Sequence, residues 1–308
     1  MNFRKDSFMM TQQVEEVAEK PVASKIVAII LTFNSEASIT KVIDSCKDFV
    51  ARILVVDSFS VDQTVNIATS LGCEVVQHEF ENYSKQRNWA QAYAKLDSED
   101  WVLHLDSDEV VSSQLATSIQ AAIIDNSQEV DGYLVRRLSY FLGHPIRFGH
   151  TNPSWHLRLY KASKGFCEDR LYDQHFVVTT EKIKKLQGLL LDLQLTTIEK
   201  WIASHNRWSS AEAIEILSQL EVTKNTNSRI LSASLKGDLR MQKRWLKNNL
   251  YYRSPAFLRV FLVFIYSYFF RLGFLDGKIG LIYHILQAFW FRFVVDSKIT
   301  EIQLRKSS

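Results

Sequence analysis

The chain has 308 residues, of which 46% are hydrophobic, and it carries 37 Lys and Arg against 34 Asp and Glu. This length allows a full hydrophobic core, and the low content of Pro (4) and Gly (10) excludes a collagen-like or low-complexity chain. The cysteines Cys46, Cys73 and Cys167 are widely spaced and form no CxxC pair. We therefore expect reduced thiols, not a disulfide framework or a zinc site.

The net charge of +3 is unevenly distributed along the chain. Residues 236–308 contain 13 Lys and Arg and 4 Asp and Glu, a net charge of +9, which leaves −6 for the first 235 residues. The basic segment is also rich in Phe, Tyr and Trp, which favours a membrane surface as its anionic partner. The free-standing basic runs typical of nucleic-acid binding are missing, so we expect no nucleic-acid partner.

Residues 1–24 are polar and charged, without the apolar core of a secretory signal, and we expect a disordered leader. From residue 25, short β-branched apolar runs alternate with helical patterns. The predicted strands are 25–31, 52–56, 73–77 and 101–105, and the predicted helices are 36–48, 62–71, 83–95 and 112–125. Ser112 or Ser113 is expected to cap the last helix. The alternation predicts an α/β fold, with an open, Rossmann-like, mostly parallel central sheet and helices on both faces.

The second half of the chain has a different pattern. Short strands are predicted at 132–137, 156–160 and 176–179, and helices at 197–220, 238–252 and 256–295. The polar segment Lys224–Ser228 interrupts this pattern, which places a boundary near residue 230. We therefore expect a catalytic domain of residues 25–230 and a C-terminal helical, aromatic-rich region of residues 231–308.

Polar side chains follow three of the predicted strands: Asn34, Asp57 and Asp106. Ligands of open parallel sheets bind beyond the carboxyl ends of the strands, so these side chains are candidates for one site. Asp106 and Asp108 in the segment LDSDE supply the oxygen ligands that Mg²⁺ and Mn²⁺ prefer, usually together with substrate phosphates. Asn34 and Asp57 would then contact a nucleoside. The alternative for both is structural, as a turn former and a helix cap.

Two arginines are candidate ligands of a diphosphate. Arg87 lies in SKQRNW together with Lys85, and one of these two could reach the diphosphate or the base, although Lys85 also fits a solvated helix face. Arg158 lies inside the strand-like segment HLRLY. Guanidinium groups pair well with phosphate, although a structural ion pair is an equal alternative for Arg158.

Four motifs in combination, TFNSE (32–36), VVDSFSVDQT (55–64), KQRNWA (85–90) and WVLHLDSDE (101–109), resemble glycosyltransferase family 2, which has the GT-A fold. The later RLYK (158–161), HNRWS (205–209) and GFLDG (273–277) are similar to the branch of lipopolysaccharide-core β-1,4-glucosyltransferases. The resemblance covers about residues 25–295. It implies inverting transfer from a nucleoside-diphosphate sugar, usually UDP-linked, to a cell-envelope glycan or a lipid-linked acceptor.

The resemblance also implies roles for individual residues. Thr32, Asn34 and Glu36 would line the nucleoside pocket, and Asp57 would hold the base. Asp106 would contact the ribose side of the donor, and Asp108 would bind the divalent metal.

An inverting enzyme needs a general base, and here the chain departs from its relatives. The relatives carry a Val-His-Glu motif where this chain has Tyr172-Asp173-Gln174, and a glutamine cannot act as a base. The nearby carboxylates Asp169, Asp173 and Glu168 are the candidates, and Asp169 is preferred because CEDR resembles the wider family's Glu-Asp motif. The alternative is that these acids pair with Arg170 or Arg158.

A second departure concerns the metal. Where the relatives place a histidine before the long helix, this chain has Asp192, which we expect to be a metal ligand beside Asp106 and Asp108. His175 is an alternative replacement.

The longest uncharged apolar runs of the C-terminal region are Val260–Phe270 and Ile279–Phe291. Both are shorter than the ~20 residues of a spanning helix. We therefore expect residues 256–295 to lie on the inner face of the membrane, which makes the protein cytoplasmic and peripheral. Packing on the catalytic domain or on a second subunit of a homo-oligomer is the alternative.

Two other classes of function compete with sugar transfer. A nucleotidyltransferase would need a glycine-rich basic loop after its first strand, and TFNSEASIT (32–40) contains neither glycine nor a basic residue. The altered Val-His-Glu motif favours a catalytically silent nucleotide-sugar-binding or scaffold protein at the membrane.

Overall fold

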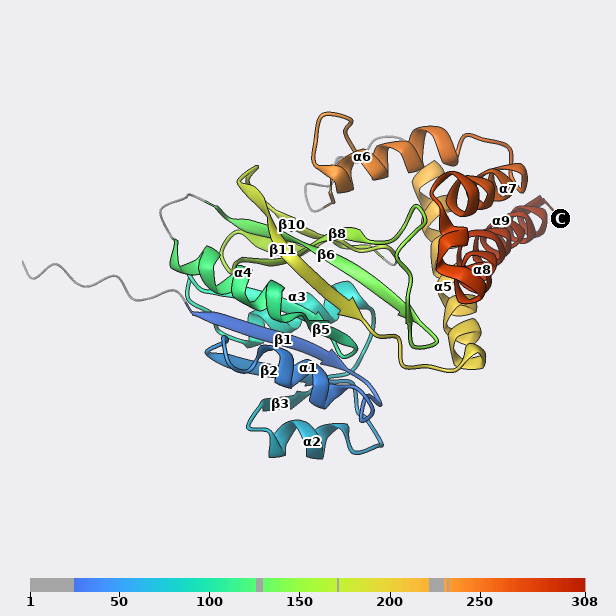
Figure 1. The fold of residues 1–308 in the computed structure, drawn as a ribbon. Coiled ribbons are helices and arrows are strands. Elements are labelled where there is room, and N and C mark those ends of the chain that lie inside the picture. The colour runs from blue at the N-terminus through green and yellow to red at the C-terminus, as the bar shows by residue number, and fades with distance from the viewer. Residues whose placement is uncertain (1–24, 126–129, 171, 222–229, 232, 308) are drawn as a thin grey trace, which may run out of the picture.

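The computed structural model describes residues 25–125, 130–170, 172–221, 230–231 and 233–307. The expected leader, residues 1–24, and the expected boundary at Lys224–Ser228 lie outside these ranges. Within the described residues, the centre of the molecule is a nine-stranded sheet with the order β3-β2-β1-β4-β8-β6-β11-β5 and β7 paired to β6. Figure 1 shows this sheet with the C-terminal helices gathered at one end.

The first half of the sheet is parallel, as predicted. It consists of β1 (Ile26–Thr32), β2 (Arg52–Asp57), β3 (Glu74–Gln77) and β4 (Trp101–Asp106), each within one residue of the predicted bounds. The register pairs Thr32 with Asp57 and Leu31 with Asp106. The carboxyl ends of β1, β2 and β4 therefore meet at the same edge of the sheet.

The second half of the sheet is mixed. β8 (Ser154–Lys161) is antiparallel to β4 and to β6 (Gly132–Phe141), and β11 (Ile183–Asp192) runs parallel to β6. β5 (Glu109–Val111) closes the order antiparallel to β11, and β7 (His144–Pro145) pairs with the end of β6. A separate pair is formed by β9 (Gly165–Cys167) and β10 (Phe176–Val178). The prediction missed β5 and β11, because IKKLQGLLLD mixes lysines with leucines and lacks a clean alternation.

Helices cover both faces of the sheet, because side chains along β1 alternate between them. Ala28 and Ile30 pack in one core with α1 (Ile39–Cys46), α2 (Thr64–Ser70) and α4 (Ser113–Ile124). Ile29 and Leu31 pack in a second core with α3 (Tyr83–Tyr93) and the β9–β10 pair. Ser112 caps α4, as one of the two predicted caps. The predicted fold class, a Rossmann-like α/β sheet with a C-terminal helical region, is confirmed.

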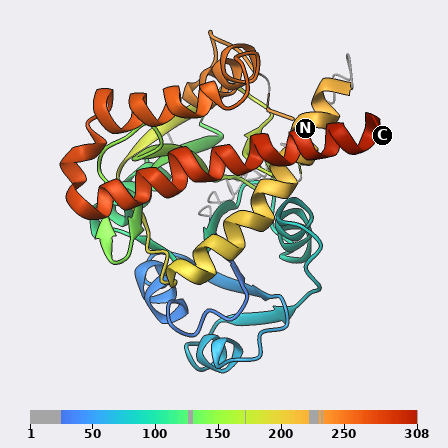
Figure 2. The same ribbon diagram turned by 90° about the vertical axis from the view of Figure 1, so that its right-hand side faces the viewer.

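The long helix α5 (Ile198–Glu221) ends the described part of the predicted catalytic domain, and the C-terminal region continues with α6 (Leu239–Leu246) and η1 (Lys247–Tyr251). A helical hairpin comes next. Its elements are α7 (Leu258–Ile265), η2 (Tyr266–Phe270), η3 (Gly273–Asp276), α8 (Gly277–His284), η4 (Ile285–Trp290) and α9 (Phe291–Ser307). α9 crosses α5 (Figure 2), where Phe291 and Val295 pack against Ile216.

The second arm of the hairpin corrects one expectation. Residues Gly273–Lys306 form one helix of 34 residues, which by length and composition alone could cross a membrane. Two of the charges in this segment, Arg292 and Asp296, are paired inside the protein. Arg292 binds Glu212 of α5 at 2.7 Å, and Asp296 binds Arg259 of α7. The apolar run therefore continues through these residues instead of ending at them.

Candidate active site

The loop after β2 is built around the Asp57 carboxylate, which is fully buried. It accepts hydrogen bonds from Thr32 Oγ1 at 3.0 Å, the Ser60 amide at 2.8 Å and Gln77 Nε2 at 3.1 Å. A buried carboxylate needs such donors. In this structure Asp57 therefore shapes the crevice from within, and its predicted contact with a nucleotide base stays a prediction.

Asn34 and Glu36 lie on the rim of the same crevice. The backbone of Asn34 is left-handed, with φ 49°, a conformation that asparagine tolerates better than most residues. Its Oδ1 accepts from the Val61 amide at 2.9 Å, and Glu36 Oε2 accepts from the Gln63 amide at 3.0 Å. Both side chains tie the loop after β1 to the loop after β2.

Asp106, at the end of β4, is held between the two predicted arginines. Arg87 of α3 approaches Asp106 Oδ1 at 2.8 Å, and Arg158 of β8 approaches Oδ2 at 2.9 Å. Burial alone would raise the pKa of Asp106, but the charges of the two arginines outweigh it and hold the pKa well below its usual range. The structure thus joins three residues that are 19 and 52 positions apart in the sequence.

Two further charged residues extend this cluster, and the sequence analysis gave neither a role. Glu109 binds Arg158 at 2.5 Å, and Arg137 lies 3.4 Å from Glu109 and 3.2 Å from Asp192. They meet because β5 pairs with β11 and sets Asp192 opposite Glu109. No local sequence pattern predicts that pairing. Arg137, on β6, could have been recognised only if β11 had been predicted to lie between β6 and β5.

Asp108 is the carboxylate of this cluster that forms no ion pair with a described arginine, although the positive charge of Arg137 acts on it. Its backbone oxygen accepts from the Leu193 amide at 2.9 Å, which places it beside Asp192 as expected. Its carboxylate makes no hydrogen bond or ion pair with any residue that the structure describes. Burial, and then the negative charges of Asp192 and Asp106, raise its pKa well above the usual range.

Such a carboxylate suits a bound cation. In the described part of the chain, no group of three or more His, Cys, Asp or Glu side chains is placed to hold a metal ion unaided. Mg²⁺ and Mn²⁺ usually take one or two carboxylates and complete their coordination with substrate phosphates and water. Asp108, with Asp106 and Asp192 nearby, could therefore bind a divalent cation whose remaining ligands are the oxygens of a diphosphate and water.

A sequence profile described as glycosyl transferase family 2 matches residues 27–177. A glycosyltransferase of Rickettsia bellii is 32% identical over 211 residues, which cover 64% of this chain and 69% of the relative. The chain belongs to glycosyltransferase family 2. A Rickettsia prowazekii glycosyltransferase is 30% identical over 206 residues, covering 63% of this chain and 69% of the relative. The protein is accordingly a glycosyltransferase, with the GT-A fold expected of its family.

A comparison with solved structures matches Staphylococcus aureus TarS 1–349, at 17% identity and a TM-score of 0.40, with 92% of both chains covered. Another match is glucosyl-3-phosphoglycerate synthase of Mycobacterium tuberculosis, solved with Mn²⁺, UDP and glucosyl-3-phosphoglycerate. It has 14% identity and a TM-score of 0.42, and the match covers 66% of this chain and 82% of that chain.

Among the three candidate bases of this glycosyltransferase, Glu168 is engaged in the core. It is fully buried, and both oxygens bind Arg244 of α6 at 2.6 Å. It also accepts from the amides of His175 and Leu231, each at 2.8 Å. Burial alone would raise the pKa of Glu168, but Arg244 lowers it. These contacts make Glu168 a link between the catalytic fold and the C-terminal region.

Asp173 is also paired. Lys247 lies 3.1 Å from its carboxylate, and this charge outweighs burial and holds the pKa of Asp173 far below its usual range. The neighbouring Gln174 donates to the backbone oxygen of Arg170 at 2.9 Å. A carboxylate with such a low pKa is a weak base at neutral pH.

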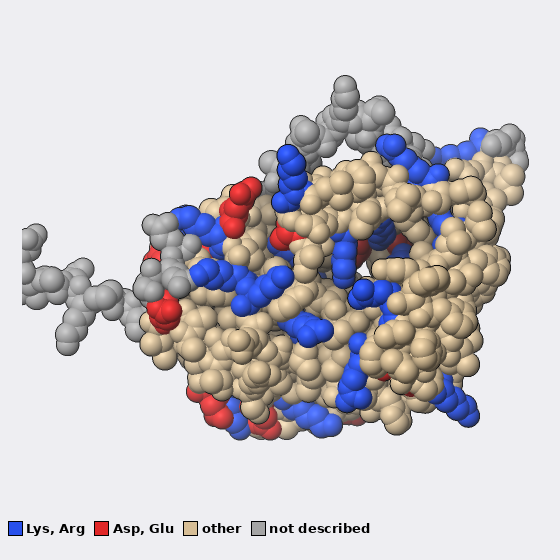
Figure 3. Space-filling model, turned by 45° about the horizontal axis from the view of Figure 1, so that its top comes forward, with Lys and Arg blue, Asp and Glu red and all other residues tan. Residues whose placement is uncertain are grey.

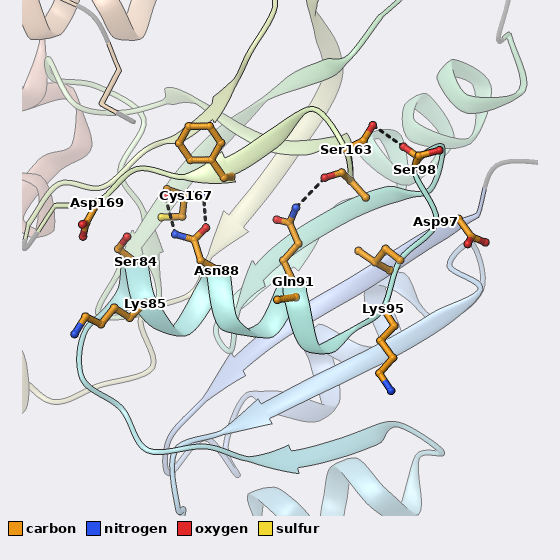
Figure 4. Close-up of a pocket in the computed structure, with 14 residues that line it drawn as sticks. Ser84, Lys85, Asn88, Gln91, Lys95, Asp97, Ser98, Ser163, Cys167 and Asp169 are labelled. Carbon is orange, nitrogen blue, oxygen red and sulfur yellow. Dashed lines mark hydrogen bonds between the residues drawn. The ribbon is translucent and has the colours of Figure 1, made fainter. Parts of the chain in front are cut away.

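Asp169 differs from both, because its carboxylate makes no hydrogen bond or ion pair with the described residues. It lies at one end of a groove of about 890 Å³, beside Ser84 and Lys85 (Figure 4). The rest of the groove follows α3 and β9 and contains none of the other predicted site residues. Arg87, on the same helix, reaches Asp106 instead.

One more side chain of the crevice was quoted in the sequence motif HNRWS but given no role. Arg207 of α5 is exposed, and its charge acts on the hydroxyl of Tyr83 together with those of Asp106, Arg87 and Asp108. Burial remains the largest influence and raises the pKa of Tyr83. Arg207 is therefore close enough to Tyr83 for its charge to act there, which makes it a further candidate to meet the donor.

Proposed function

We propose that this glycosyltransferase transfers a sugar, with inversion, from a UDP-linked donor to a cell-envelope glycan or a lipid-linked acceptor. The observation that carries the proposal is the Asp108 carboxylate. It has a raised pKa and makes no ion pair with the described residues, and it lies at the edge where β1, β2 and β4 end. A uracil base is proposed because the motifs around Asn34 and Asp57 resemble those of UDP-dependent relatives.

The chain's own residues divide the work of such a transfer. Asp108, with Asp106 and Asp192, would hold Mg²⁺ or Mn²⁺, and the metal would neutralise negative charge on the departing diphosphate. Arg87 and Arg158 fix Asp106 in place. Thr32 and Asp57 keep the nucleoside end of the crevice in shape.

A thermal-shift panel of UDP-, GDP-, CMP- and dTDP-sugars, each with and without Mn²⁺, tests the donor. A donor present at ~100 times its Kd should stabilise the protein by about 2.7 kcal/mol, because only the folded state binds it. We expect stabilisation by UDP-sugars that requires Mn²⁺. Stabilisation by another nucleotide alone would refute the uracil assignment, and tight UDP binding without any turnover would favour a silent nucleotide-sugar-binding protein.

We further propose that Asp169 is the general base. Asp169→Asn should lower kcat by roughly 10²–10⁴-fold, the usual contribution of a positioned base, while the Kd for UDP stays unchanged. Asp173→Asn is the matched variant, because it removes the same charge from a carboxylate already paired with Lys247. If Asp169→Asn retains full activity and Asp173→Asn loses it, the assignment moves to Asp173.

The C-terminal hairpin is proposed to bind the cytoplasmic face of the membrane. Large apolar side chains are exposed along it, among them Leu258, Phe261, Leu262, Ile265, Tyr266, Phe269, Phe270, Leu272, Phe274 and Leu275. A contiguous apolar surface of this kind is unusual on a soluble monomer. Its other face packs on α5 through Arg292–Glu212, which favours a helix lying along the membrane over one that crosses it.

A further inference from the structure

A small pocket of about 280 Å³ lies where the catalytic fold meets the turn of the C-terminal hairpin. Three arginines line it: Arg136 from β6, Arg147 from the loop after β7, and Arg271 from the turn between η2 and η3. The lining contains no Asp or Glu. All three arginines are exposed, and their guanidinium groups make no ion pair or hydrogen bond with the described residues. The pocket therefore has a concentrated positive charge without a protein counterion.

The pocket is held in shape by backbone contacts. The Asp276 carboxylate, the nearest acid in these contacts, accepts from the amides of Arg147 at 3.1 Å and Phe148 at 2.9 Å. The Gly149 amide donates to the Arg271 backbone oxygen at 3.0 Å. At Gly149, with φ 106°, a Cβ atom would come within 2.4 Å of the His284 ring. The glycine thus permits the close approach that brings Arg147 and Arg271 together.

The neighbouring charges reinforce the positive field. Lys243 of α6 has its pKa lowered by burial and then by the charge of Arg271. His150, which follows the pocket-lining Gly149, has its pKa lowered to about 3 by burial, with Arg292, Lys243 and Arg271 adding to the effect. It is therefore neutral at physiological pH. On the face shown in Figure 3, Lys and Arg side chains outnumber Asp and Glu and gather around a hollow.

The rim of the pocket is apolar and continuous with the exposed hairpin. Phe148, Phe270 and Leu272 line it beside the arginines. Phe270 is 74% exposed, and its neighbour Phe269 is 55% exposed. A ligand that satisfies both parts of the site carries a phosphate for the guanidinium groups and hydrocarbon for the rim.

We propose that this pocket binds the phosphate headgroup of an anionic phospholipid while the exposed side chains of the hairpin enter the bilayer. The pocket would fix the orientation of the enzyme on the membrane, because Arg136 lies on the same strand, β6, as Arg137, which binds Asp192 at 3.2 Å. This inference rests on the membrane association proposed above and is independent of the sugar donor.

The test is vesicle sedimentation of the full chain with phosphatidylcholine alone and with phosphatidylcholine containing phosphatidylglycerol. Each basic residue near an anionic surface contributes about 1 kcal/mol, so removing three should weaken partitioning by roughly a hundredfold. We therefore expect Arg136→Gln/Arg147→Gln/Arg271→Gln to lose this binding to the anionic vesicles. The control Lys41→Gln/Lys47→Gln/Lys184→Gln removes the same charge from exposed positions on α1 and β11 and should bind like wild type.

A second variant separates the pocket from charge alone. Arg136→Lys/Arg147→Lys/Arg271→Lys keeps the charge but loses the forked donors, and we expect it to bind anionic vesicles more weakly than wild type. The proposal would be overturned if the glutamine and lysine variants of the three arginines bound anionic vesicles as well as wild type. It would also be overturned if the control Lys41→Gln/Lys47→Gln/Lys184→Gln lost as much binding as the glutamine variant.

A thermal-shift measurement with inorganic phosphate distinguishes a soluble phosphate ligand from a lipid headgroup. If phosphate stabilises the wild type but not the glutamine variant, while both bind vesicles equally, the pocket serves a soluble phosphate and the lipid assignment fails. Stabilisation by UDP with Mn²⁺ should be the same in all variants. If the wild type does not bind UDP at all, the donor proposal fails, whereas the lipid result is unaffected.

Discussion

Asp108→Asn is expected to abolish sugar transfer and, at the same time, to stabilise the protein in the absence of metal. The carboxylate makes no ion pair with the described residues. Burial and the neighbouring charges of Asp192 and Asp106 raise its pKa, and the charge of Arg137 offsets this only in part. Removing its negative charge relieves that repulsion, and we expect a gain of about 1 kcal/mol in the free energy of unfolding at neutral pH. The same change removes a metal ligand, and we expect kcat to fall by about 100-fold or more.

The pH dependence gives the sign of the stability effect. The folded-state pKa of Asp108 is raised above its ordinary value of 3.8. The protonated Asp108 side chain therefore contributes its full stability below pH 3.8. The contribution is lost as pH rises through the folded-state pKa. The advantage of Asp108→Asn should therefore grow with pH in urea titrations without metal. Asp48→Asn, at an exposed position after α1, is the control. A variant that is less stable than wild type at neutral pH would contradict the repulsion.

Arg244→Met is expected to cause the largest loss of stability. It leaves the fully buried Glu168 without the guanidinium that binds both of its oxygens at 2.6 Å. Breaking a buried ion pair from one side typically costs about 3–5 kcal/mol, because the remaining charge stays buried. Urea unfolding monitored by tryptophan fluorescence measures this cost, with Arg305→Met, in an exposed pair with Glu301, as a control that should change little.

The double variant Glu168→Gln/Arg244→Met separates the charge from the packing. It removes both charges, and we expect it to recover a substantial part of the stability that Arg244→Met loses. In the wild type the pKa of Glu168 is lowered from 4.5, so its contribution is present above that value and is lost as pH falls through the folded-state pKa. If Arg244→Met unfolds like wild type, Glu168 does not link the catalytic fold to the C-terminal region as described.

The parallel half of the sheet could be predicted from the sequence because its signals are local. Each of β1, β2 and β4 is a short apolar run that ends at a polar residue, and the edge they share follows from their being parallel. The convergence of Asn34, Asp57 and Asp106, each at or just after the end of one of these strands, needed only this rule.

The rest of the site depends on pairing between distant segments. Arg137, Glu109 and Asp192 meet through β5 and β11, and neither strand has a clear alternating pattern. The resemblance to the family, not the periodicity, led to Asp192. In the same way, the length of the final helix depends on the partners of Arg292 and Asp296, which lie on α5 and α7. Sequence periodicity contains no information on such partners.

Equilibrium binding of a labelled UDP-sugar, with and without Mn²⁺, to wild type and to Asp108→Asn tests the central claim most directly. We predict binding of one donor per chain to wild type that requires Mn²⁺ and is lost on chelation. Asp108→Asn should bind the donor weakly and equally with and without the metal. Donor binding that is unchanged by both chelation and Asp108→Asn would contradict the assignment of the metal and diphosphate to this edge of the sheet.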